Sequence, residues 1–171
     1  MEQNLIYVKE KKGARVAKPL FIILAVLLVV AIILLNVFTH LLPIVRYYGS
    51  GMEPTLKNGQ VLLVSKTAKI REGDIVAFYY NNKVLVRRAV CLGGSYISIA
   101  KDGLVTIDNQ AIEETYLDRT SIGQCNLSFP HYVLPNHVFV MGDNREASMD
   151  SRLTEIGDIP MDRVIGKVIN K

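Results

Sequence analysis

The interpretation of this chain starts from one stretch, Gly49-Ser50-Gly51-Met52-Glu53-Pro54-Thr55-Leu56. A long apolar tract ends only a few residues before it, at Pro43. We therefore divide the chain into a basic segment of residues 1–18, an apolar segment of residues 19–42 and a third segment of residues 43–171. The quoted stretch lies near the start of the third segment.

The apolar segment is long enough to cross a membrane. Leu20 to Leu35 are sixteen consecutive apolar residues, and apolar residues recur as far as Leu42. At ~1.5 Å of rise per residue, roughly 20–24 residues span about 30–36 Å, which covers a hydrocarbon core of ~30 Å. A cleaved signal peptide has a shorter apolar region followed by a small-residue cleavage site. We therefore expect a retained transmembrane helix.

Cations flank this segment unequally. After it the nearest is Arg46, whereas five precede it: Lys9, Lys11, Lys12, Arg15 and Lys18. Basic residues beside a transmembrane helix remain on the cytoplasmic side. We therefore expect a single-pass protein of the plasma membrane, in contact with its lipid bilayer. Its N-terminus is expected in the cytoplasm and its C-terminal domain outside.

The composition of the chain argues against several classes of function. The 171 residues carry a net charge of +4, and much of this charge belongs to the basic segment, so we see no nucleic-acid-binding surface. No cluster of histidines and cysteines predicts a metal site, and we expect neither a metal nor a cofactor. Cys91 and Cys125 could pair outside the membrane, and their spacing leaves this open.

Short apolar runs between turn residues indicate that the third segment forms strands. Asn81-Asn82 and Asp102-Gly103 each separate two such runs, which is the pattern of a β-hairpin. We expect a mainly β fold, in which an antiparallel β-domain (a sandwich or a partly closed barrel) follows the transmembrane helix. The runs are Val61 to Val64, Ile75 to Tyr80, Val84 to Val86, Ile97 to Ile99, Leu104 to Ile107, Val138 to Met141 and Val164 to Ile169.

The quoted stretch resembles the nucleophile segment of type I signal peptidases, Gly-x-Ser-Met-x-Pro-Thr-Leu. When Met52 to Leu56 are aligned with this pattern, Gly51 takes the position of the nucleophile and Ser50 lies one residue too early. In this family a neutral lysine accepts the proton of the attacking serine. Glycine has no side chain that could attack a peptide bond. The oxygen atom that serves as the nucleophile in the family is therefore missing at this position.

Residues 86–94 are similar to the family's general-base stretch, Lys-Arg-Val-Ile-Gly-Leu-Pro-Gly-Asp. Arg87 takes the position of the catalytic lysine, and Arg88 that of the neighbouring arginine. Gly93 and Ser95 replace the usual proline and aspartate. Because a guanidinium stays protonated in proteins, Arg87 cannot act as the base. We therefore expect no catalytic residue at either position.

Residues 142–152 give the strongest match. The family pattern is Gly-Asp-Asn-Arg-x-x-Ser-x-Asp-Ser-Arg, and all eight specified residues agree. The resemblance implies that Ser148 corresponds to the serine that hydrogen-bonds the catalytic lysine. It also implies that Asp150 and Arg152 form a salt bridge. We predict that five residues support the architecture of the site: Asp143, Arg145, Ser148, Asp150 and Arg152.

Two further stretches complete the resemblance. The lead-in Arg46-Tyr47-Tyr48 corresponds to an extended strand beside the substrate, and an exposed strand edge can bind an extended peptide. Residues 107–117 resemble a surface hairpin without a catalytic role, in which we expect Asp108, Glu113 and Glu114 to face solvent. The predicted groove residues are Tyr47, Tyr48, Gly49, Ser50, Met52 and Pro54.

We therefore predict a signal peptidase I family protein without catalytic activity. It would bind the signal or anchor segments of exported or surface proteins and assist their processing or assembly. One alternative is an active signal peptidase that uses Ser50 with Lys66, Lys69 or Lys83 as a displaced base. It requires a shift of one residue, which in a strand turns the side chain to the opposite face. The other alternative is a structural subunit of a membrane complex.

Overall fold

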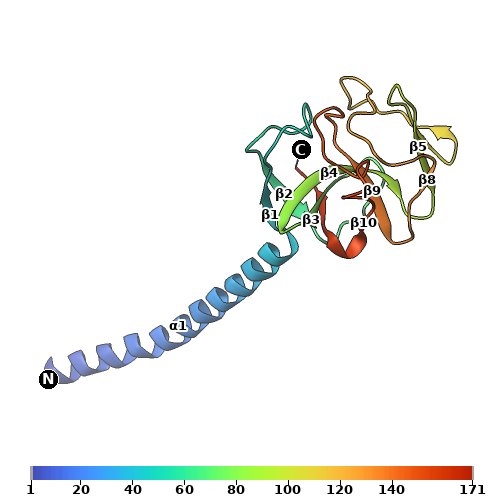
Figure 1. Cartoon of the computed structure of the whole chain (residues 1–171). Coiled ribbons are helices and arrows are strands. Elements are labelled where there is room, and N and C mark those ends of the chain that lie inside the picture. Colours follow the sequence, from blue (N-terminus) through green and yellow to red (C-terminus); the bar gives the residue numbers. More distant parts are fainter. Residues whose placement is uncertain (1, 171) are drawn as a thin grey trace. The chain divides into compact units, whose positions relative to one another are not determined.

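The chain forms two compact units, which meet in the sequence between Leu41 and Leu42. The computed structural model describes residues 2–170 and the side chains of residues 19–170. The first unit is one helix and the second is built from strands, as Figure 1 shows.

The first unit is helix α1 (Glu2–Leu41), which contains Pro19. The 23 residues from Pro19 to Leu41 are long and apolar enough to cross a membrane. Within this span the side chains are exposed in the isolated chain, including Phe21 and Leu35. A helix that is apolar on all sides and covered by no protein core suits a lipid environment.

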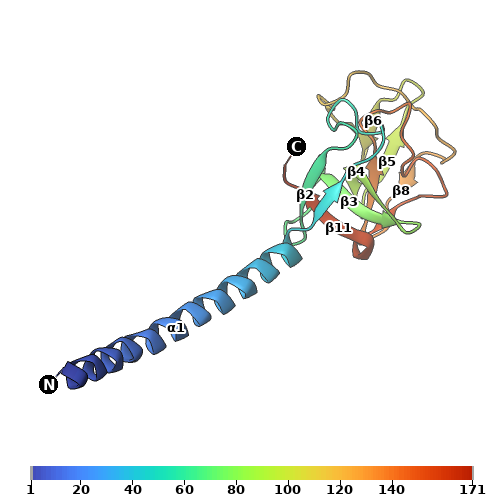
Figure 2. The same cartoon turned by 90° about the vertical axis from the view of Figure 1, so that its left-hand side faces the viewer.

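The second unit is mainly antiparallel β, as predicted. One sheet has seven strands in the order β1-β2-β11-β3-β4-β9-β10, and the other has four in the order β7-β6-β5-β8 (Figures 1 and 2). The strands are β1 (Ile44–Arg46), β2 (Val61–Ser65), β3 (Ile75–Tyr80), β4 (Lys83–Leu92), β5 (Tyr96–Ile99), β6 (Val105–Ile107), β7 (Gln110–Ala111), β8 (His131–Tyr132), β9 (His137–Met141), β10 (Ile159–Pro160) and β11 (Val164–Val168). A short 3₁₀ helix, η1 (Met161–Arg163), precedes β11.

Both predicted hairpins are present. Asn81 and Asn82 have φ angles of 44° and 58°, and they connect β3 to β4. Two successive residues with positive φ form the turn that fits the twist of a two-residue hairpin, and asparagine tolerates this conformation. The second hairpin joins β5 to β6 around Asp102-Gly103.

The quoted stretch is anchored in the core of this unit. Met52 and Leu56 are fully buried, and they belong to an apolar cluster that includes Leu62 and Val64 of β2. The Leu56 amide donates a hydrogen bond to the Met52 carbonyl at 2.9 Å, which closes one tight turn. This packing fixes the backbone at Gly51, directly before Met52.

The two cysteines do not pair in the structure. Cys91 is buried and Cys125 is partly exposed, and both are free thiols. Burial raises the pKa of Cys91 to about 12, so its thiol stays protonated at neutral pH.

Met52 should contribute more to stability than an exposed methionine. Met52→Ala should lower the free energy of unfolding by about 2–5 kcal/mol, because it removes a fully buried side chain and leaves a cavity. Met149 is 55% exposed, so Met149→Ala is the matched control and should change the value by no more than ~0.5 kcal/mol. Urea unfolding would measure both, and equal losses would contradict the placement of Met52 in the core.

Candidate functional site

Three residues from distant parts of the chain meet at one point. Gly51 follows β1, Arg87 lies on β4, and Ser148 lies between β9 and β10. A β-carbon added to Gly51 would be 3.3 Å from Arg87 Nη2 and 3.3 Å from Ser148 Oγ. A side chain at position 51 would therefore face the two positions that the family resemblance pairs with the nucleophile.

Beside this point lies a groove with a volume of about 530 Å³. Four of the six predicted groove residues line it: Tyr47, Tyr48, Gly49 and Ser50. The other lining residues are Gly51, Tyr80, Asn81, Lys83, Val84, Leu85, Val86, Arg87, Ala147, Met149 and Ile156. The groove is therefore lined by apolar side chains of β4, such as Val84 and Leu85, together with the exposed residues 48–50.

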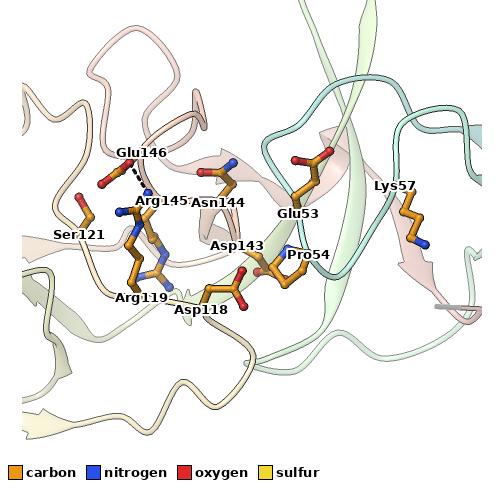
Figure 3. Close-up of a pocket in the computed structure, with 10 residues that line it drawn as sticks. All are labelled: Glu53, Pro54, Lys57, Asp118, Arg119, Ser121, Asp143, Asn144, Arg145 and Glu146. Carbon is orange, nitrogen blue, oxygen red and sulfur yellow. Dashed lines mark hydrogen bonds and ion pairs between the residues drawn. The ribbon is translucent and has the colours of Figure 1, made fainter.

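The remaining two predicted groove residues lie elsewhere. Met52 is fully buried, because its side chain packs in the core with Leu56. Pro54 lines a different cavity of about 360 Å³, together with Asn144, Arg145 and other polar residues (Figure 3). The turn after Gly51 directs these two side chains away from the groove, so neither belongs to its wall.

One strand edge along the groove is open. β4 pairs with β3 from Lys83 to Arg88, and it pairs with β9 only from Arg88 to Leu92. Within the described part of the chain, residues 83–87 thus have a strand partner on one side only. An open edge flanked by apolar side chains is suited to an extended peptide, which can add its own backbone hydrogen bonds.

Arg87 is held rigidly at the inner end of this edge. Its side chain is buried, and the whole residue is 7% exposed. Nε donates a hydrogen bond to the Met149 carbonyl at 3.0 Å, and Nη1 donates to the Val86 carbonyl at 2.7 Å. Burial lowers the pKa of Arg87, and nearby Asp150 opposes this effect. The group nevertheless stays protonated, since guanidinium does not lose its proton in proteins.

The other buried arginines each pair with a carboxylate. Asp143 is tied to two parts of the site, because Arg88 Nε donates to its Oδ1 at 2.8 Å and Thr55 Oγ1 donates to its Oδ2 at 2.5 Å. The quoted stretch is thereby joined to β4. The three buried pairs are Arg88–Asp143, Arg145–Glu114 and Arg152–Asp150.

The predicted pair of Asp150 and Arg152 is formed and completely buried. Arg152 donates twice to the carboxylate, from Nε to Oδ1 at 2.8 Å and from Nη2 to Oδ2 at 2.7 Å. Asp150 Oδ2 also accepts from the Gly142 amide at 2.9 Å, and Arg152 Nη1 donates to the Ile122 carbonyl at 2.7 Å. The pair therefore joins the end of β9 to the loop around Ile122, which lies earlier in the chain.

The expectation that Glu114 faces solvent is wrong. Its side chain is 5% exposed, accepts hydrogen bonds from both terminal nitrogens of Arg145, and accepts another from the Tyr116 hydroxyl at 2.6 Å. The sequence carried no sign of this, because the partner lies 31 residues away. Arg145, predicted to support the site, is thus fixed by a residue that the motif does not contain.

The Ser148 hydroxyl makes no hydrogen bond to the described residues. It is 1% exposed, and Ser148 Oγ is the buried side-chain polar atom that makes no hydrogen bond within the described residues. Gly142 allows its close approach, since a β-carbon there would lie 2.1 Å from Ser148 Oγ and 2.3 Å from the Gly51 carbonyl oxygen. Any side chain at position 142 would push the serine away from Gly51.

Ser50, the nucleophile of the alternative enzyme, lies in a different environment from Ser148. It is exposed and lines the groove together with Lys83. Lys66 and Lys69 are exposed and are not among the groove-lining residues. Ser50 and Lys83 make no side-chain hydrogen bond to each other in the part of the chain that the structure describes. At the three positions that meet, Gly51 has no side chain, the Arg87 guanidinium stays protonated, and Ser148 has a buried hydroxyl.

The buried Arg152–Asp150 ion pair should contribute far more to stability than an exposed ion pair. Arg152→Ala should lower the free energy of unfolding by about 3–5 kcal/mol, because it leaves the Asp150 charge buried without its partner. Arg119→Ala is the control, since it breaks an ion pair whose side chains are 75% and 52% exposed and should cost at most ~1 kcal/mol. Chemical unfolding of both variants measures the difference, and similar losses would contradict a structural role for the pair.

Comparisons with known proteins agree with this architecture. The family model described as "Signal peptidase, peptidase S26" matches residues 17–170. A signal peptidase I of Bacillus caldolyticus is 32% identical, over 94% of this chain and 90% of that protein. The signal peptidase I T of Bacillus subtilis is 34% identical, over 69% of this chain and 67% of that protein. The crystal structure of a signal peptidase I from Enterococcus faecalis is 25% identical, with a TM-score of 0.50, and covers 60% of this chain and 98% of that one. The chain belongs to the signal peptidase I family.

Proposed function

We propose that this protein is a non-catalytic member of its family, which binds segments of exported or surface proteins and assists their processing or assembly. One observation carries the proposal: the position that faces Arg87 and Ser148 is a glycine. Serine at this position would be the nucleophile, and glycine offers no atom that could form an acyl-enzyme. Arg87 adds a second obstacle, because a permanently charged guanidinium cannot accept a proton.

The groove supports a role in peptide binding. The open edge of β4 can extend the sheet by one strand, and Val84 and Leu85 present apolar surface beside it. Tyr48 is 69% exposed and lines the opposite side, where Arg46 lies over its ring at 5.8 Å. Exposed tyrosines contribute strongly to interfaces, because they combine a large apolar area with a polar group.

We further propose that the protein has the membrane orientation that its charge distribution favours. The five cations before Pro19 would remain in the cytoplasm, so that the β-domain lies outside the plasma membrane. A peptide that emerges from the membrane in an extended form could then reach the groove. Signal or anchor segments of exported proteins are the peptides found in this location.

The protein should not cleave a secretory precursor. Purified full-length protein in detergent should release no more product than buffer alone, because loss of a nucleophile costs a serine peptidase on the order of 10⁶ in rate. The signal peptidase I of Bacillus caldolyticus serves as the positive control. Cleavage by the natural chain that Ser50→Ala abolishes would contradict the proposal and establish the alternative enzyme that uses Ser50.

The groove should bind an apolar peptide. Tyr48→Ala should weaken the affinity about fivefold or more, since truncation of an interface tyrosine commonly costs over ~1 kcal/mol. Tyr79→Ala is the matched control, because Tyr79 is 58% exposed and is not among the groove-lining residues. Fluorescence anisotropy measures both. If neither the natural chain nor the variants bind any peptide, a purely structural subunit becomes the better description.

The orientation has a direct test. Protease added to intact protoplasts should digest the β-domain and leave the first eighteen residues intact, because the membrane protects only the cytoplasmic side. Lysed protoplasts are the control, in which both parts should be digested. Protection of the β-domain in intact protoplasts would show the opposite orientation.

A further inference from the structure

The groove contains positive charge that the protein does not compensate. Its fifteen lining residues include two cations, Lys83 and Arg87, and no carboxylate. The buried arginines outside the groove each have a carboxylate partner, whereas Arg87 takes part in no ion pair among the described residues. A buried charge without a partner is costly, and it favours the binding of an anion.

The unpaired part of Arg87 faces the space above Gly51. The Met149 and Val86 carbonyls hold Nε and Nη1, while Nη2 donates to no group in the described part of the chain. A β-carbon at Gly51 would lie 3.3 Å from Nη2 and 3.3 Å from Ser148 Oγ. Nη2 is therefore the donor of Arg87 that remains for a ligand in the groove, whereas Ser148 Oγ, on the same side of Gly51, is buried.

The same end of the groove is closed to a longer peptide. A strand added to the open edge of β4 can run beside residues 83–87, but β9 occupies that edge from Arg88 onward. A bound peptide must therefore end or turn at Arg87. The free donor of Arg87 and its positive charge would repel an ammonium group and attract a carboxylate at this point.

We propose that Arg87, which lines the groove, binds the C-terminal carboxylate of a peptide that lies there. The inference rests on the proposed function, because it assumes that the groove holds a peptide. It specifies that the ligand has a free C-terminus at Arg87, so the peptide runs parallel to β4. A signal segment acquires a free C-terminus only by hydrolysis of a peptide bond, so a signal segment bound in this way would be the N-terminal product of that cleavage.

Three peptides with the same apolar sequence and an N-terminal fluorophore test this assignment. The first ends in a free carboxylate, the second in a carboxamide, and the third in an aspartyl carboxamide. Full-length protein in detergent should bind the free acid roughly 10- to 100-fold more tightly than the carboxamide, as expected for a hydrogen-bonded charge pair. The aspartyl carboxamide should bind less tightly than the free acid, because its carboxylate extends from a side chain.

Variants of the same protein locate the carboxylate. Arg87→Met should remove the preference for the free acid, and Arg87→Lys should retain part of it through the remaining charge. Gly51→Ala should also reduce the preference, because the added β-carbon would lie 3.3 Å from Arg87 Nη2 and crowd a carboxylate bound there; Gly51 does not have a left-handed backbone that would disfavour this change. Lys83→Met is the matched control for charge. It can weaken the binding of all three peptides, but their ratio should not change.

The outcomes separate this inference from the proposed function. Equal affinity for the free acid and the carboxamide would overturn the inference and leave peptide binding in place. The assignment to Arg87 would be overturned if the preference for the free acid survived in Arg87→Met and Gly51→Ala. It would also be overturned if that preference disappeared in Lys83→Met. Tighter binding of the aspartyl carboxamide would show that the site takes a side chain. Binding of none of the peptides would contradict both proposals.

Discussion

The β-domain depends on how it compensates buried positive charge. An arginine that leaves water must recover its lost hydration from carboxylates and carbonyls. Here Asp150 does this for Arg152, and because both side chains are fully buried, the pair also fixes the end of β9. Asp143 performs the same task for Arg88 and at the same time accepts from Thr55. These few ion pairs join loops that are far apart in the sequence.

This constraint gives residues 142–152 a structural role, whatever residues stand at positions 51 and 87. The buried carboxylates hold the backbone on both sides of the site, because Asp150 accepts from the Gly142 amide and Asp143 accepts from Thr55 and Arg88. Their loss would destabilise the fold whether or not a reaction occurs. Gly142 has a similar role, because only glycine lets Ser148 Oγ and the Gly51 carbonyl approach its Cα so closely. Glycine at 51 and arginine at 87, by contrast, alter chemistry while the frame around them keeps its contacts.

Much of this architecture follows from local sequence. The apolar span and the two hairpins are encoded by composition and turn residues, and the match at residues 142–152 indicates the pairing of Asp150 with Arg152. Long-range contacts are different. No local pattern shows that Glu114 pairs with Arg145, that Met52 packs inward, or that Pro54 lines another cavity. These features depend on the path of the backbone after Gly51 and on which loops the folded sheets bring together.

The residues at positions 51 and 87 also fit each other in size. A β-carbon at Gly51 would lie 3.3 Å from both Cζ and Nη2 of Arg87, which is closer than most such contacts between side chains. A serine would place a further oxygen beside the same guanidinium, so the long side chain at 87 favours the smallest residue at 51. The two departures from the family pattern are therefore best understood as one structural change. Together they place a residue without a side chain beside a fixed positive charge.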